Sequence, residues 1–129
     1  MKLISLNIEG HKHLDLQVPF FQCEKPDILC LQEVFQSDFE FLKTELGMEG
    51  HFAPMCKRQR IDQDGKSIFE EFGVTILSKL AMYARQPYYY FNDGNMIREY
   101  TGEETNNAQQ QVNKVLLVCT LTGSDDSSL

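Results

Sequence analysis

Two short, almost continuous apolar runs open the chain, at residues 3–8 and 28–31. Runs of this length without a polar alternation are typical of strands that are buried on both faces. The segment between them, residues 14–23, is apolar but contains Pro19, which predicts a short helix. A strand, a crossover helix and a second strand form a βαβ unit, in which the two strands are parallel. Asn7 and Glu33, which end the two strands, should therefore emerge at the same edge of the sheet.

The next segment has the pattern of an amphipathic helix. Ser37 and Glu40 have the spacing of a capping box, apolar residues follow at helical spacing, and Gly47 is a typical helix stop. This pattern predicts a helix that begins at Ser37 and ends before Gly47.

Four further apolar segments predict strands, at residues 51–57, 72–77, 82–91 and 112–121. Residues 58–67 are predicted to form a charged loop, and residues 82–91 to continue the sheet as far as a turn at residues 92–94. Residues 101–111 are polar and predict a mobile loop. Residues 123–126 carry a turn signal that no return strand follows, so one hypothesis is that the natural chain continues.

Composition indicates a single globular domain. Apolar residues make up 42% of the 129 residues and charged residues 24%, and only the last few residues are too polar to pack. We therefore predict one domain at residues 1–123 and a disordered polar tail at residues 124–129. The net charge of −7 argues against a surface that holds nucleic acid mainly by neutralising phosphates, although it does not exclude such a ligand.

Cysteine spacing and the absence of long apolar segments bear on location. The four cysteines show no C-x-x-C pair and no regular spacing, which favours reduced thiols. The apolar run at the start is too short for a signal peptide, and no segment is long enough to span a membrane. The sequence therefore predicts a cytoplasmic protein.

The strand ends carry the candidate chemistry. A carboxylate such as Glu33, just past a buried strand, is a suitable oxygen ligand for Mg²⁺. Asn7 could bind a phosphate oxygen or orient a water molecule without adding negative charge. Each residue could equally be a turn residue that bonds the nearby backbone.

Three segments in order resemble the amino-terminal half of the endonuclease/exonuclease/phosphatase family: Ile-Ser-Leu-Asn-Ile-Glu-Gly at residues 4–10, Lys-Pro-Asp-Ile-Leu-Cys-Leu-Gln-Glu-Val at residues 25–34, and Phe-Gly-Val-Thr-Ile-Leu-Ser-Lys at residues 72–79. The resemblance implies an α/β fold, the amino-terminal half of a two-sheet α/β sandwich with helices on the outside. It also implies hydrolysis of phosphate esters with Mg²⁺ or Mn²⁺. By the same motifs, Glu33 would be the metal-binding glutamate, and Asn7 would line the metal and phosphate site.

Motifs from the second half of that family are missing from the 129 residues. There is no later active-site histidine, no Gly-Asp-x-Asn and no Ser-Asp-His. The resemblance thus implies a phosphodiesterase- or nuclease-like hydrolase that is incomplete as this chain. The alternative is a non-catalytic binding module that keeps the first sheet and associates with itself or a partner through an open sheet edge. The substrate stays open among DNA, phosphoinositides, lipids and nucleotides.

Several other side chains have two interpretations each. His11 and His13 could contact phosphate or be solvated. Cys23, His51 and Cys56 could be assembled into a zinc site, although their spacing matches no known zinc finger. The basic residues Lys57, Arg58 and Arg60 could contact a phosphate backbone or belong to a solvated loop, and the aromatic residues 88–91 could stack on a ligand or pack in the core.

Overall fold

A computed structural model describes residues 1–102 and 111–122 of the chain. The elements occur in the order β1 (Leu3–Asn7), α1 (Leu14–Glu24), β2 (Ile28–Phe35), α2 (Gln36–Leu46), β3 (Glu49–Ile61), β4 (Ser67–Ser78), β5 (Met82–Phe91) and β6 (Lys114–Leu121). Most of the predicted polar loop at residues 101–111, and the predicted tail at residues 124–129, lie outside the described residues. No helix in the described ranges is long and apolar enough to cross a membrane.

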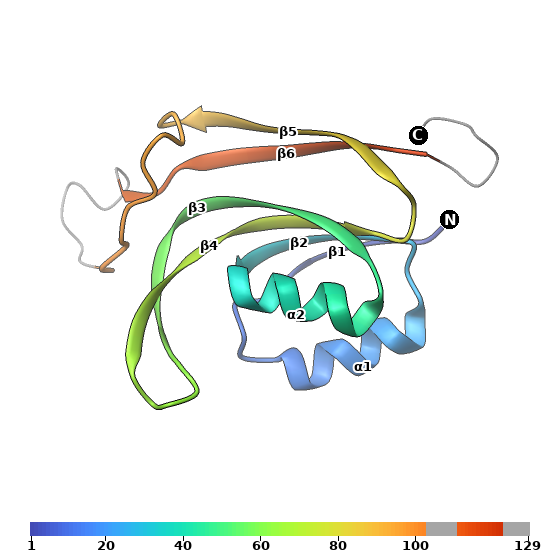
Figure 1. Cartoon of the computed structure of the whole chain (residues 1–129), viewed down its shortest axis with the longest axis horizontal. Helices are drawn as coiled ribbons and strands as arrows, with labels where there is room; N and C mark the ends of the chain where they lie inside the picture. Colours follow the sequence, from blue (N-terminus) through green and yellow to red (C-terminus); the bar gives the residue numbers. More distant parts are fainter. Residues whose placement is uncertain (103–110, 123–129) are drawn as a thin grey trace.

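The strands form two sheets. Four of them form a mixed sheet in the order β1-β2-β4-β3, and β5 and β6 pair antiparallel as a second sheet. In Figure 1 the second sheet runs along one side of the first, and both helices lie on the other side. The prediction that residues 82–91 continue the first sheet is wrong: they form a strand with the predicted bounds, but that strand pairs with β6.

The apolar core lies on both faces of the first sheet. On the helix side, Leu29 and Leu31 of β2 pack with Phe21 of α1 and Leu42 of α2. On the opposite side, Ile28 packs with Met82 and Leu121 of the second sheet. Burial on both faces explains why β2 is apolar without interruption from Ile28 to Leu31, because it leaves no position there for an alternating polar residue.

Strand β1 is parallel to β2, as the βαβ pattern predicts, with Asn7 opposite Gln32. The prediction that β1 is buried on both faces is wrong. It is the edge strand of the sheet, its residues alternate between exposed and half-buried, and the side chain of Leu3 is 54% exposed. An edge strand has a neighbour on one side only, so its apolar residues are covered less completely.

Both helices differ in detail from the predicted patterns. Helix α1 runs through Pro19 for 11 residues. Helix α2 ends at Gly47 in the left-handed conformation, as predicted, but the predicted capping box is wrong. The N-cap is Phe35, and the Ser37 hydroxyl, already within the helix, donates to the carboxylate of Glu70 at 2.8 Å instead.

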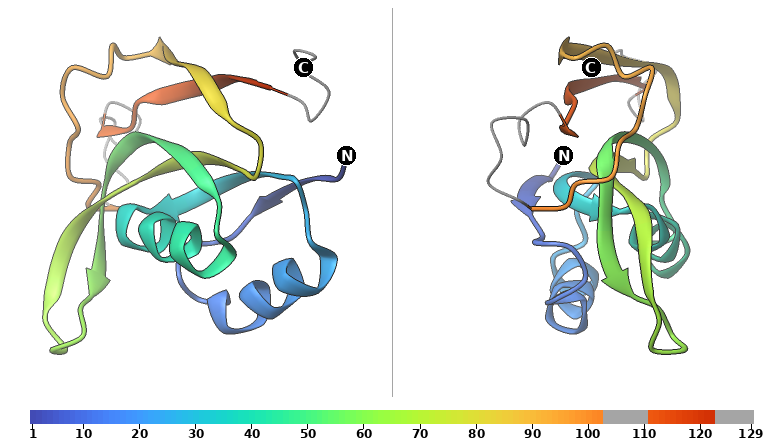
Figure 2. Two further views of the ribbon diagram at one scale, coloured as in Figure 1. Left: turned by 45° about the vertical axis from the view of Figure 1, so that its right-hand side comes forward. Right: turned by 90° about the vertical axis from the view of Figure 1, so that its left-hand side faces the viewer.

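Half of the charged loop predicted at residues 58–67 is strand. Strands β3 and β4 extend to Ile61 and from Ser67, which leaves only residues 62–66 as the connection. Figure 2 shows this hairpin extending past the rest of the first sheet. A strand that projects into solvent can carry charged residues on both faces and need not alternate with apolar ones. The hydrophobic pattern therefore did not indicate that the two strands extend into this segment.

Candidate functional site

The structure brings Asn7 and Glu33 to one cavity of about 300 Å³. Asn7 ends β1, and Glu33 follows Gln32, the residue opposite Asn7 in the parallel pair. The two side chains therefore come from neighbouring strands. The prediction that Glu33 follows the end of its strand is wrong, because β2 continues to Phe35 and Glu33 lies within it. Their placement on a common cavity is a geometric finding, whereas their roles stay predictions.

Glu33 is the extra residue of a β-bulge. Gln32 pairs with Val74 and Val34 pairs with Gly73, so Glu33 has no partner on β4. Its φ of 57° lies in the left-handed region, where a residue with a Cβ is strained. Bulges often re-aim a side chain next to an active site. The Glu33 carboxylate is half-buried and makes no hydrogen bond or ion pair within the described parts of the chain.

The loop after β1 forms another wall of the cavity. Its Glu9 and Gly10 also have left-handed φ values, 55° and 67°. The loop is tied to β2 by hydrogen bonds from the Ile8 amide to the Gln32 carbonyl and from the Gly10 amide to the Glu33 carbonyl, at 3.0 and 2.8 Å. Glycine adopts the left-handed conformation without strain, so only Glu9 is strained here, and strained residues concentrate at functional sites. The sequence indicated a turn at Gly10, but nothing in its hydrophobic pattern indicated that Glu9 would line a cavity.

Asn7 has a local structural role. Its side-chain oxygen accepts a hydrogen bond from the Glu9 amide at 3.0 Å. This is the interaction expected of a turn residue, which is the alternative to a functional role for Asn7. Its amide nitrogen makes no hydrogen bond to any residue within 1–102 and 111–122. Asn7 can therefore shape the loop and still donate to a ligand.

The histidines of the loop have separate environments. His11 lines the cavity, and its ring centroid lies 5.6 Å from that of Phe35. His13 lies 3.7 Å from the carboxylate of Glu9. The third histidine, His51, belongs to β3 and pairs with Ile76, away from the cavity, and partial burial lowers its pKa.

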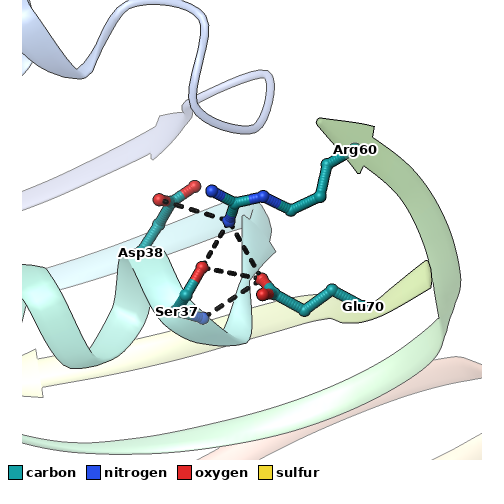
Figure 3. A network of polar contacts seen from close by, with 4 residues as sticks. All are labelled: Ser37, Asp38, Arg60 and Glu70. Atoms are coloured by element: carbon teal, nitrogen blue, oxygen red, sulfur yellow. Dashed lines mark hydrogen bonds and ion pairs between the residues drawn. The ribbon is translucent and has the colours of Figure 1, made fainter. Parts of the chain in front are cut away.

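The basic cluster is split by the hairpin. Arg58 lines the cavity, where its guanidinium carbon lies 4.8 Å from the ring centroid of Phe72. Arg60 points instead into a polar network with Ser37, Asp38 and Glu70 (Figure 3), and its Nη1 lies 3.1 Å from the Glu70 carboxylate. Of these two arginines, only Arg58 has its charge directed at the cavity.

The oxygen donors at the cavity suit a hard cation. Mg²⁺ is usually held by one or two carboxylates and retains several water molecules. Glu33 offers an unpaired carboxylate, and Glu9 and Asn7 lie on the same cavity. No group of three or more His, Cys, Asp or Glu side chains in the described ranges is placed to hold a metal, so the closed ligand set of a structural zinc site is not formed there.

Comparison with known proteins finds structural matches only. No family model matches the sequence, and no curated protein does. The fold matches an endonuclease/exonuclease/phosphatase family protein from Leptotrichia buccalis, with a TM-score of 0.64 and 13% identity over 96% of this chain and 50% of that one. It also matches the endonuclease/exonuclease/phosphatase from Bacteroides vulgatus, with a TM-score of 0.60 and 15% identity over 96% of this chain and 47% of that one. The chain thus has the fold of about half of these proteins, as its three sequence segments predict.

Proposed function

We infer that this chain carries the metal- and phosphate-binding part of a hydrolytic site for phosphate esters. One observation carries the proposal: Glu33 is held in a strained bulge, with an unpaired carboxylate, on the same cavity as Asn7. The match of the fold to endonuclease/exonuclease/phosphatase proteins supports it, because it points to a phosphoesterase lineage.

In this proposal Glu33 holds Mg²⁺ or Mn²⁺ and Asn7 binds the phosphate. The metal, when bound, polarises a phosphoryl oxygen as a Lewis acid. Asn7 donates a hydrogen bond from its amide nitrogen, and the charge of Arg58 attracts the anionic ester. These cationic and neutral donors are needed locally because the whole chain has a net charge of −7, which repels phosphate esters at long range.

Turnover needs groups beyond these. An activated water requires a base, and His11, whose side chain lines the cavity, is the candidate for this role. The solved structures that this chain matches are about twice as long as the matched region. We therefore propose binding of metal and phosphate as the property of this chain, and hydrolysis as the property of the complete site.

The direct test measures binding of Mn²⁺ by electron paramagnetic resonance, with Mg²⁺ as competitor. We expect Glu33→Gln to weaken Mn²⁺ binding at least tenfold, as is typical when a carboxylate near a metal is lost. Glu45→Gln, an exposed carboxylate at the end of α2, removes the same charge and should leave the affinity unchanged. Equal affinities for the two variants would disprove the role of Glu33. Hydrolysis of bis-p-nitrophenyl phosphate by the same variants then tests turnover.

The second candidate function is a binding module without catalysis. It is favoured by the second sheet, where Tyr88 and Leu116 are paired across the strands and both remain more than half exposed. Binding of Mn²⁺ at Glu33 favours the first candidate, whether or not the chain associates. Association without metal binding favours the second.

A further inference from the structure

A larger cavity adjoins the Glu33 cavity. It has a volume of about 680 Å³, within the range of small-molecule sites. Arg58 and Phe72 line both cavities, so the two share a wall made by the β3–β4 hairpin. A ligand whose phosphate lies near Glu33 could therefore place its remaining part in the larger cavity.

The walls of this cavity are aromatic. Phe72 comes from the first sheet, Tyr90 and Phe91 come from β5, and Tyr100 follows the turn after β5. Aromatic side chains that converge on an open space bind planar rings by stacking. An aliphatic chain gains less from this lining, because stacking needs a second flat surface.

The charged residues that the structure places on this cavity are basic. Arg58 and Lys114 line it, and none of its lining residues within 1–102 and 111–122 is an aspartate or glutamate, although acidic residues outnumber basic ones 19 to 12 in the whole chain. This imbalance favours an anionic ligand over a neutral or cationic one.

Arg58 is placed by aromatic rings and not by a carboxylate. Its guanidinium carbon lies 4.8 Å from the ring of Phe72 and 5.6 Å from that of Tyr100. It has no ion pair within residues 1–102 and 111–122. Arg60, two residues later, is engaged by Glu70 and Asp38. Of the two, Arg58 is thus the arginine whose charge is available to a ligand at the boundary of the cavities.

We propose that the larger cavity is the subsite for a planar aromatic group joined to the phosphate, so that the preferred substrates are aromatic phosphate esters. The aromatic group stacks between the side chains of Tyr90 and Tyr100, and Arg58 contacts the phosphate where the cavities meet. This assignment rests on the proposed function of the Glu33 cavity.

The test compares three monoesters that share one headgroup: methyl, hexyl and phenyl phosphate, each titrated with saturating Mg²⁺ by isothermal calorimetry. We expect phenyl phosphate to bind about tenfold more tightly than methyl phosphate, the magnitude of one stacking contact. Hexyl phosphate should bind more weakly than phenyl phosphate, because its chain gains the burial of apolar surface but not the stacking. Equal affinities for hexyl and phenyl phosphate would overturn the aromatic assignment in favour of a general apolar site.

Matched tyrosine variants locate the subsite. The side chain of Tyr90 is 73% exposed, so Tyr90→Ser should fold normally and lose the advantage of the phenyl ester. Tyr88→Ser, two residues earlier on β5 and outside the cavity, should keep it. Independently of any variant, NMR should show contacts between the phenyl protons and the methyl groups of Val112. Absence of those contacts, or an equal loss in both variants, would overturn the proposal.

The two proposals fail differently. If methyl phosphate binds with Mg²⁺ and depends on Glu33, but phenyl phosphate binds no better, the proposed function stands and the aromatic subsite does not. If phenyl phosphate binds in the cavity without any dependence on Glu33 or Mg²⁺, the subsite stands as a binding site and the proposed function does not.

Discussion

Glu33 combines a functional side chain with an unfavourable backbone. The left-handed conformation costs a residue with a Cβ roughly 1–2 kcal/mol, and glycine avoids this cost. No hydrogen bond or ion pair of its carboxylate to the described residues offsets that cost. A residue selected for stability alone would be glycine or asparagine, so the presence of glutamate here is an argument for a ligand.

At position 33 we therefore expect the glycine variant to be more stable than the alanine variant, which is the reverse of the usual order. We expect Glu33→Gly to have a free energy of unfolding about 0.5–1 kcal/mol higher than Glu33→Ala, since glycine relieves the strain but loses more backbone entropy. In helix α2 the order should be the usual one, with Glu45→Gly about 1 kcal/mol less stable than Glu45→Ala. Urea unfolding of the four variants measures both differences. The same order at both positions would show that Glu33 is not strained.

A second residue-scale prediction concerns Asp38 in the polar network of Figure 3. Burial raises the pKa of this carboxyl above its ordinary value of 3.8, and Arg60 and His11 only partly oppose the shift. Between 3.8 and the raised native pKa, the folded chain binds more protons than the unfolded chain, so the Asp38 contribution to the free energy of unfolding falls as pH rises.

Asp38→Asn removes this pH dependence. The free energy of unfolding of the variant minus that of the wild type should rise with pH from about 3.8 and level off above the native pKa. Asp64→Asn, in the hairpin connection, controls for the loss of one charge. Chemical unfolding at a series of pH values measures the difference, and a difference that falls as pH rises would contradict the sign of the shift.

At the scale of elements, the sequence pattern correctly predicted the features that depend only on residues close together in the chain. The periodic apolar positions and Gly47 placed α2 correctly, and the bounds of β5 matched because a turn follows it at once. The edge position of β1 and the pairing of β5 with β6 depend on strands distant in sequence, which no local pattern reports. At the site, the strand ends indicated Asn7 and Glu33, whereas the bulge at Glu33 depends on the pairing of β2 with β4 and could not be predicted.

Gly73 of β4 connects the sheet to the site. It lies opposite Val34 and Pro54, the residues at which both neighbouring strands have their bulges. A Cβ at Gly73 would lie 2.0 Å from the carbonyl oxygen of Ala53, too close for any side chain. Glycine here allows the central strand to approach β3, and the bulge that presents Glu33 lies across the same residue.

Two glycine substitutions should consequently differ in kind. Gly47→Ala meets no atom within 4 Å and should cost only the conformational term, about 1 kcal/mol, with Mn²⁺ binding unchanged. Gly73→Ala forces β3 and β4 apart, so we expect its free energy of unfolding to fall by more than about 2 kcal/mol. The amount of Mn²⁺ bound should fall in proportion to the folded fraction. Thermal unfolding and Mn²⁺ titration of both variants test this, and equal stabilities would refute the close approach.

At the scale of the whole molecule, the described chain is a sandwich in which the first sheet is covered on both faces and the second sheet on one face only. The first sheet has helices on one face and the second sheet on the other (Figure 1). Strands β5 and β6 keep exposed apolar side chains. Tyr88 and Leu116 form a cross-strand pair there, and Val118 lies near them on β6. Grouped exposed apolar side chains of this kind mark association surfaces, whereas single ones do not.

This surface should make the chain self-associate at high concentration. We expect sedimentation equilibrium to show reversible dimers that increase with salt, because the net charge of −7 on each copy opposes association and salt screens it. Leu116→Glu should restore the monomer, since it adds charge to the centre of the patch. Leu16→Glu is the control, because Leu16 is 69% exposed on α1, away from the second sheet. If both variants act alike, net charge and not the patch controls association. If Leu116→Glu alone does so and Mn²⁺ binding is unchanged, the apolar face and the Glu33 cavity are independent surfaces, and one chain can hold a metal and a partner together.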